Sequence, residues 1–184
     1  MTRRLLSIAF GLATLVAPAR AQWKPTMVIL VRHAEKAAEP AADPPLTEAG
    51  AARARALAAA LEHARVQAVI TTELTRTRET ARPVAEADHL SPEVVHSGPR
   101  AEHVKAVAAA VRRHEGETIL VVGHSNTVPA IIAALGGPTL PDICDSQYST
   151  LYVLYLDGSR ASLVTSSYGA PSPDPAATCP RTMK

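Results

Sequence analysis

The chain has few aromatic residues, with one Phe, one Trp and four Tyr among 184 residues. It therefore offers no series of rings on which nucleic-acid bases could stack. It also lacks a basic stripe: outside its first 21 residues, 16 Lys and Arg stand against 17 Asp and Glu. We expect no nucleic-acid partner. The core has to be built from Ala, Val, Leu and Ile.

Cysteine is scarce as well, and neither Cys144 nor Cys179 lies in a CxxC or other metal-ligand spacing. The seven histidines include no H-x-H or H-E-x-x-H pattern. No metal and no cofactor is implied. In an oxidising compartment we expect a Cys144–Cys179 disulfide, the alternative being two independent buried thiols.

The chain has no apolar run long enough to span a bilayer, because Leu5–Val16 falls short of the required length. Arg3 and Arg4 precede this run, and Ala19-Arg20-Ala21 is an A-x-A cleavage site. Residues 1–21 are therefore predicted to be a secretory signal peptide, the alternative being an uncleaved anchor. We expect a periplasmic or secreted protein whose mature chain, residues 22–184, is one domain without a membrane span.

Hydrophobic periodicity predicts alternating strands and helices. The expected strands are 27–31, 66–71 and 118–123, with a short strand at 93–96. The expected helices are one that Thr47 caps and that ends at about 64, one from about 74 onward, 101–115 and 128–135. Asp157-Gly158 joins a carboxyl-terminal hairpin of strands 151–156 and 161–167, and the Pro-rich tail from about 169 is irregular. Pro83 should kink or split its helix. This order predicts an α/β three-layer sandwich, a mostly parallel central sheet with helices on both faces.

Two predicted strands run directly into histidine. Met27–Val31 is followed by Arg32 and His33, and Thr118–Gly123 is followed by His124 and Ser125. Right-handed crossovers bring the carboxyl ends of parallel strands to one rim of the sheet, where ligands bind in such folds. The loop after the second strand adds Arg76 and Arg78 to the same rim.

These residue types favour a phosphoryl ligand. Guanidinium groups match phosphate oxygens in bidentate geometry, and helix amino termini near the rim add positive potential. Flanking arginines disfavour protonation of His33, and a bond from its second ring nitrogen to a carbonyl would fix its tautomer. We therefore expect His33 to attack phosphorus, forming a phosphohistidine that water then hydrolyses.

At this point the chain resembles the histidine phosphatase superfamily, which includes the phosphoglycerate mutases. The resemblance covers nearly all of residues 26–157 and rests on four short motifs in order: Arg32-His33, Leu46-Thr47-Glu48-Ala49-Gly50, Leu74-Thr75-Arg76 with Thr80-Ala81, and Val121-Val122-Gly123-His124-Ser125. It implies that His33 is the nucleophile. It also implies that Arg32, Arg76 and His124 complete the phosphate pocket, with Arg76 rather than Arg78 matching the motif. Ser125 is a further candidate for substrate binding.

Two positions depart from the family pattern. Ala34 stands where glycine is usual, which carries a steric cost only if the backbone there needs a positive φ. The general acid is not obvious: Glu102 is the best-placed candidate in the family's interval, and Glu35 and Asp145 are alternatives. The alternative interpretation of Glu102 is a carboxylate that complements the dipole of its helix.

Other charged side chains are predicted to be superficial. Arg53, Arg55 and Arg65 are expected on a solvated helix face, and the same holds for five histidines: His63, His89, His96, His103 and His114. The expected enzyme is a phosphomonoester hydrolase acting on a phosphorylated small molecule or sugar phosphate in an open pocket. Its alternatives are a phosphate-binding protein without turnover and a phosphohistidine protein phosphatase.

Overall fold

A computed structural model describes residues 24–173 of the chain. The predicted signal peptide and Cys179 lie outside this range. The described elements alternate along the chain: β1 (Thr26–Arg32), α1 (Glu48–Leu61), β2 (Ala68–Thr71), α2 (Thr75–Ala87), β3 (Glu93–Val94), α3 (Arg100–Arg113), β4 (Thr118–Gly123), α4 (Val128–Ala134), β5 (Thr150–Asp157) and β6 (Arg160–Ser167). None of the helices between residues 24 and 173 combines the length and apolarity needed to cross a membrane.

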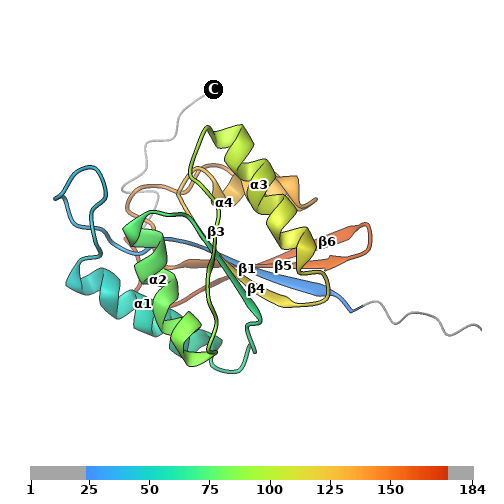
Figure 1. The fold of residues 1–184 in the computed structure, drawn as a ribbon, viewed down its shortest axis with the longest axis horizontal. Helices are drawn as coiled ribbons and strands as arrows, with labels where there is room; N and C mark the ends of the chain where they lie inside the picture. Colours follow the sequence, from blue (N-terminus) through green and yellow to red (C-terminus); the bar gives the residue numbers. More distant parts are fainter. Residues whose placement is uncertain (1–23, 174–184) are drawn as a thin grey trace, which may run out of the picture.

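The six strands form one mixed sheet in the order β3-β2-β4-β1-β5-β6. Strands β1, β2, β3 and β4 are parallel, whereas the β5–β6 hairpin adds to β1 in the antiparallel sense. Figure 1 shows the hairpin at one edge of the sheet and β2 and β3 toward the other. The predicted α/β sandwich with its antiparallel carboxyl-terminal edge is confirmed.

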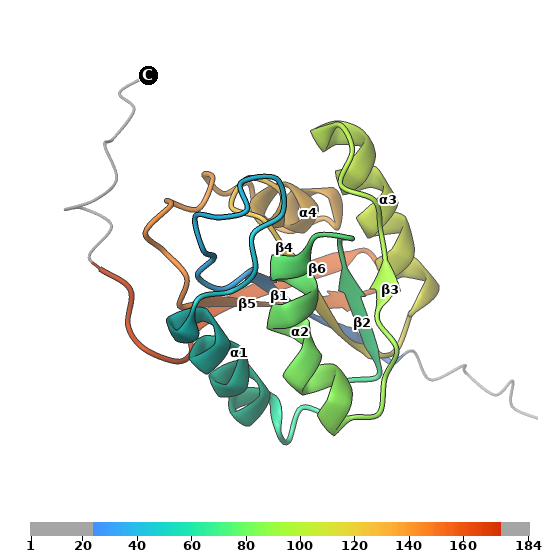
Figure 2. The ribbon, with the colours of Figure 1, turned by 60° about the vertical axis from the view of Figure 1, so that its left-hand side comes forward.

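The core has two layers because β1 is buried on both of its faces. Val28 and Leu30 pack into the layer beneath α3 and α4, and Ile29 and Val31 pack into the layer beneath α1 and α2. Successive residues of a strand point to opposite faces, so an unbroken apolar run suits a strand covered on both sides. Figure 2 shows the two helix pairs on opposite sides of the sheet.

The start of α1 is anchored to the loop that follows β1. Thr47 caps the helix by accepting a hydrogen bond from the Gly50 main-chain nitrogen at 3.1 Å, as the sequence predicted. Its own main-chain nitrogen donates to the Glu35 oxygen at 2.9 Å. A Cβ atom on Gly50 would lie 2.2 Å from that same oxygen, so only glycine fits. This motif therefore positions the backbone just beyond His33.

Pro83 was expected to kink or split helix α2, and the split does not occur: α2 runs from Thr75 to Ala87 as one helix. Proline removes a single main-chain donor, and buried residues on both sides of it, Ala81 and Val84, pack the helix against the sheet. The remaining differences are small: β2 and β3 are shorter than predicted, and α1 ends at Leu61 rather than at about residue 64.

Candidate active site

His33 follows the last residue of β1 and is only 4 % exposed. Its Nδ1 atom lies 2.8 Å from the Ala34 carbonyl oxygen. A carbonyl can only accept, so Nδ1 carries the proton, and the neutral ring presents the Nε2 lone pair. Burial lowers the pKa of His33 to about 3; the bond to Ala34 opposes this shift, and Arg32, His124 and Arg76 reinforce it. The ring is therefore a neutral potential nucleophile near neutral pH.

Ala34 causes no backbone strain. Its φ is not positive, because Arg65 and His89 are the only non-glycine residues with positive φ between residues 24 and 173. The side chain is fully buried, and the main-chain nitrogen donates to Thr80 Oγ1 at 2.9 Å. Thr80 Oγ1 in turn donates to the Arg76 carbonyl oxygen at 2.7 Å. This pair of bonds joins the backbone after His33 to helix α2.

Arg32 is the last residue of β1, and the segment before β5 holds its guanidinium. Nη1 donates to the main-chain oxygens of Cys144 and Asp145 at 2.9 Å and of Gln147 at 3.2 Å. The guanidinium also lies 4.2 Å from the centre of the Tyr148 ring, a cation–π distance. Nε is buried and has no hydrogen-bond partner among the described residues. One N–H group of a fixed cation is thus left without a partner among the described residues.

Arg76 stands in the first turn of α2 and, like Arg32, has an N–H group that is unpaired within residues 24–173. Its Nε is also buried without a partner in the described part of the chain. Its Nη1 lies 3.9 Å from an Asp43 carboxylate oxygen, and Asp43 also accepts hydrogen bonds from the Thr75 main-chain nitrogen and hydroxyl. Asp43 therefore fixes the start of α2 from the loop between β1 and α1. Unpaired buried donors are costly, which suggests that an anion completes both arginines.

His124 follows β4 and faces His33. The two ring centres are 5.5 Å apart in an edge-on arrangement, and His124 Nε2 lies 3.4 Å from Thr72 Oγ1. Burial lowers the pKa of His124 to about 4, with Arg76 the next cause. The structure thus brings together the four residues predicted at this rim, Arg32, His33, Arg76 and His124, from three different strand ends.

The predicted acids are placed differently. Glu102 is exposed in the first turn of α3, and among the described residues it makes no hydrogen bond or ion pair with the four residues of the rim. The Glu35 carboxylate is bound by Arg53, with Nη2–Oε1 at 2.7 Å; burial raises its pKa, but the Arg53 hydrogen bonds and further interactions lower it overall. Asp145 lies 3.4 Å from Arg32 with its side chain 95 % exposed. Ser125 is half-buried beside His124, and its main-chain oxygen accepts from Ile143.

Two residues predicted on the surface are buried instead. Arg53 is 5 % exposed, and besides binding Glu35 it donates to the Tyr168 and Ala170 carbonyl oxygens at 3.2 and 2.9 Å. His103 is 3 % exposed and lies with its Nδ1 2.9 Å from the His96 carbonyl oxygen. Each stands four residues before a core residue of its helix, Leu57 and Val107, so helical periodicity could have placed both inward.

A cavity of about 250 Å³ adjoins the site on the α3 side. It is lined by Arg76 and His124 together with seven further residues: Leu74, Ser97, Gly98, Arg100, His103, Asn126 and Thr127. Neither Arg32 nor His33 lines it. The cavity therefore extends from Arg76 and His124 toward Arg100 at the start of α3.

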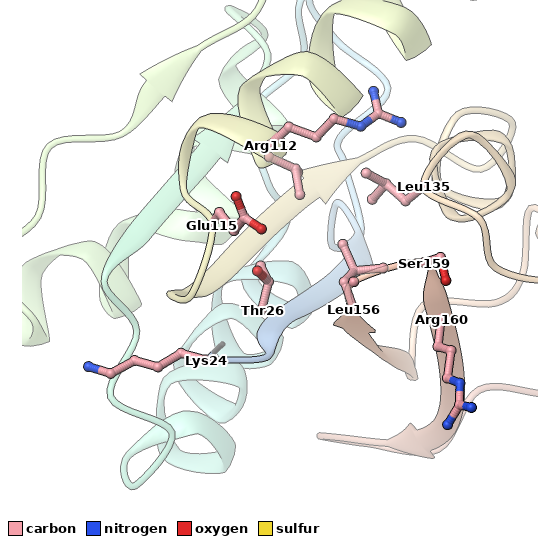
Figure 3. Close-up of a pocket in the computed structure, with 10 residues that line it drawn as sticks. Lys24, Thr26, Arg112, Glu115, Leu135, Leu156, Ser159 and Arg160 are labelled. Atoms are coloured by element: carbon pink, nitrogen blue, oxygen red, sulfur yellow. The ribbon is translucent and has the colours of Figure 1, made fainter. Parts of the chain in front are cut away.

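A second cavity, of about 270 Å³, lies at the opposite end of the sheet beside Thr26, the first residue of β1. Figure 3 shows that the charged ends of Lys24, Arg112 and Arg160 around it point in different directions. They therefore do not converge on one ligand. Among residues 24–173, no group of three His, Cys, Asp or Glu side chains is arranged to hold a metal ion.

The comparisons with known proteins agree with this geometry. The sequence model of the histidine phosphatase superfamily (branch 1) matches residues 28–97, which include Arg32, His33 and Arg76. The fold supplies the missing member, because β4 delivers His124 next to His33. Over residues 28–97, the chain is similar to the histidine phosphatase superfamily, in agreement with the resemblance seen in its motifs. This similarity supports the phosphatase activity that the motifs led us to expect. A search of curated proteins gives no significant match.

Solved structures show the same fold. The protein histidine phosphatase SixA in complex with tungstate has a TM-score of 0.63 at 23% identity, over 77% of this chain and 96% of that one. A mycobacterial glucosyl-3-phosphoglycerate phosphatase has a TM-score of 0.62 at 16% identity, over 79% and 100%. A protein from Agrobacterium tumefaciens assigned as the phosphohistidine phosphatase SixA reaches 27% identity with a TM-score of 0.54, over 79% and 98%.

Proposed function

We propose that this phosphatase hydrolyses phosphomonoesters through a phosphohistidine formed on Nε2 of His33. One observation carries the proposal. A buried neutral imidazole, with its Nδ1 proton fixed by Ala34, lies beside two arginines whose buried Nε atoms have no partner in residues 24–173. A tetrahedral dianion bound by those two donors would stand next to a lone pair able to attack it.

The reaction follows from these positions. Arg32, Arg76 and His124 bind the phosphoryl oxygens and stabilise the charge that spreads over them in the transition state. As His33 Nε2 bonds to phosphorus, the bond to the leaving oxygen breaks and an alcohol departs with a proton from solvent. Water then attacks the phosphohistidine and releases phosphate, which regenerates neutral His33. The arginines supply the positive charge, so the scheme needs neither a metal ion nor a cofactor.

A turnover assay on p-nitrophenyl phosphate in the presence of excess chelator tests this proposal. We expect activity in the wild type, loss of at least about a thousandfold in His33→Ala, and an acid-labile phosphoenzyme that maps to His33. Activity that disappears with the chelator would contradict the metal-independent scheme. Phosphate binding without turnover would favour the alternative, a binding protein on this fold.

A second candidate substrate is a phosphorylated histidine on a protein. The likeness to the A. tumefaciens SixA protein favours it, because that is the activity for which the relative is named. A histidine-phosphorylated peptide and a small sugar phosphate can be compared as substrates at equal concentration. A kcat/KM at least tenfold higher for the peptide would favour the second candidate.

Export belongs to the same proposal. The signal-peptide pattern in the sequence supports it, and so does Cys144, which is disulfide-bonded in the structure, as expected in an oxidising compartment. The predicted partner, Cys179, is not among the described residues. Fractionation of cells that produce a tagged full-length chain should find the shortened product outside the cytoplasm. A full-length product in the cytoplasmic fraction would contradict export.

A further inference from the structure

The cavity beside α3 lies where the leaving group of a substrate has to go. An attacking nitrogen and a leaving oxygen stand on opposite sides of phosphorus in phosphoryl transfer. The cavity shares Arg76 and His124 with the phosphate site but contains neither His33 nor Arg32 in its wall. It therefore borders the phosphate site at Arg76 and His124 rather than at the proposed nucleophile. This inference rests on the proposed function.

The lining of this cavity is polar. Leu74 supplies its only long aliphatic side chain, whereas Ser97, Arg100, His103, Asn126 and Thr127 supply hydroxyl, guanidinium, imidazole and amide groups. Such a wall offers an aromatic or acyl leaving group little apolar surface to bury. It suits a leaving group that carries hydroxyl groups, each of which can both donate and accept a hydrogen bond.

His103 is the buried member of that wall. Its Nδ1 atom lies 2.9 Å from the His96 carbonyl oxygen, so Nδ1 carries a proton, and the neutral ring offers Nε2 as an acceptor. Nε2 has no hydrogen-bond partner within residues 24–173. The ring is held in place by burial at 3 % exposure, and neighbouring Val104 and Val107 belong to the core. A rigid acceptor facing a cavity can select a ligand that donates to it.

We propose that this cavity is the leaving-group subsite and that it selects non-aromatic hydroxylated leaving groups such as sugars and polyols. In this subsite His103 is a specificity residue: its Nε2 accepts a hydrogen bond from a hydroxyl of the leaving group. Asn126 is exposed at the same wall and supplies a second polar contact. Arg100, which pairs with Asp142 at 2.8 Å, limits the extent of the subsite at the start of α3.

The test compares two substrates in each variant of the full-length protein: glycerol 2-phosphate, which has hydroxyl groups, and phenyl phosphate, which has none. The ratio of their kcat/KM values cancels changes common to both. His103→Leu should lower this ratio at least about fivefold, the effect of one lost hydrogen bond. His103→Gln, whose amide oxygen can accept the same bond, should keep the ratio within about twofold of the wild type.

Two further variants keep the test decisive if His103→Leu folds poorly. Asn126→Ala removes an exposed side chain of the cavity and should lower the same ratio, and His63→Leu changes an exposed histidine after α1 and should leave it unaltered. An unchanged ratio in both His103→Leu and Asn126→Ala overturns the subsite, and so does an unchanged ratio in Asn126→Ala alone if His103→Leu does not fold. Absence of turnover by the wild type on both substrates would instead refute the proposed phosphatase activity.

Discussion

Arg53 binds Glu35 through two nitrogen atoms, with Nε 2.9 Å from both carboxylate oxygens and Nη2 2.7 Å from Oε1. Glu35 stands two residues after His33, and Arg53 reaches from α1 to the carbonyl oxygens of Tyr168 and Ala170. One buried cation therefore links the loop that carries the proposed nucleophile to the segment after β6. This link is structural, because Arg53 lies in the α1–α2 layer beneath the rim.

The first prediction concerns that link. Arg53→Met should lower the free energy of unfolding by roughly 3 kcal/mol, because it leaves the partly buried Glu35 carboxylate and two carbonyl oxygens without their donor. Urea denaturation measures the loss. Arg55→Met changes an exposed arginine on the same helix and should shift stability by less than about 0.5 kcal/mol. Equal losses in the two variants would show that the Arg53 contacts contribute nothing specific.

Local patterns predict the sheet and the rim well. Apolar runs such as 28–31 and 119–122 are typical of strands covered on both faces, and chain connectivity then aligns their carboxyl ends. That is why Arg32, His33, Arg76 and His124 could be placed together from sequence. The helix cap at Thr47 could be predicted for a similar reason, because a capping side chain bonds a main-chain nitrogen only three residues away.

Apolar runs and chain connectivity do not place the buried polar residues. The burial of Arg53 depends on Glu35 and on the Tyr168 and Ala170 carbonyls, which are remote in sequence, and the burial of His103 depends on a carbonyl in the loop before α3. Charge alone predicts exposure for both. The periodicity of each helix places these two residues on its inward face. A polar side chain is stable there only because its tertiary partners satisfy its hydrogen bonds.

The second prediction is that stability falls as the solution is made acidic below pH 6.5. Burial lowers the pKa of His33 to about 3 and of His124 to about 4, whereas in the unfolded chain both titrate near 6.5. Above pH 6.5 both states are neutral at these residues. Below it only the unfolded chain binds protons, so stability decreases by roughly 1.4 kcal/mol per pH unit and residue.

Unfolding free energies measured between pH 7 and 5 test this. The single variants His33→Leu and His124→Leu should each show a smaller slope than the wild type, and the double variant the smallest. This window lies above the pKa of Glu35, which is lowered from 4.5 in the fold, so its carboxylate stays ionised in both states. Slopes that remain the same in all four proteins would contradict the neutral buried imidazoles.

The third prediction concerns Arg32→Lys. A lysine ammonium cannot hold the Cys144 and Asp145 carbonyls and at the same time direct a separate N–H toward phosphate, as the guanidinium does. We expect kcat/KM for p-nitrophenyl phosphate to fall roughly 100-fold or more, and inhibition by inorganic phosphate to weaken. Arg78→Lys, at the exposed arginine of α2, is the matched control and should stay within about twofold of the wild type. Similar losses of kcat/KM in both variants would contradict the assignment of Arg32 to the phosphate pocket.

The last prediction links the disulfide at Cys144 to the position of Arg32. The Cys144 carbonyl oxygen accepts from Arg32 Nη1 at 2.9 Å, and the same segment is held at Tyr148 and Ser149 by the Ser172 hydroxyl. Breaking the disulfide at Cys144 should loosen these carbonyls. Because small misplacements of a positioning group are costly, we expect Cys144→Ser to lower kcat/KM about tenfold and stability by roughly 2–4 kcal/mol. A reductant should lower the activity of the wild type to the level of Cys144→Ser and leave the activity of that variant unchanged. Full activity of the wild type after reduction would show that Arg32 is positioned without the disulfide.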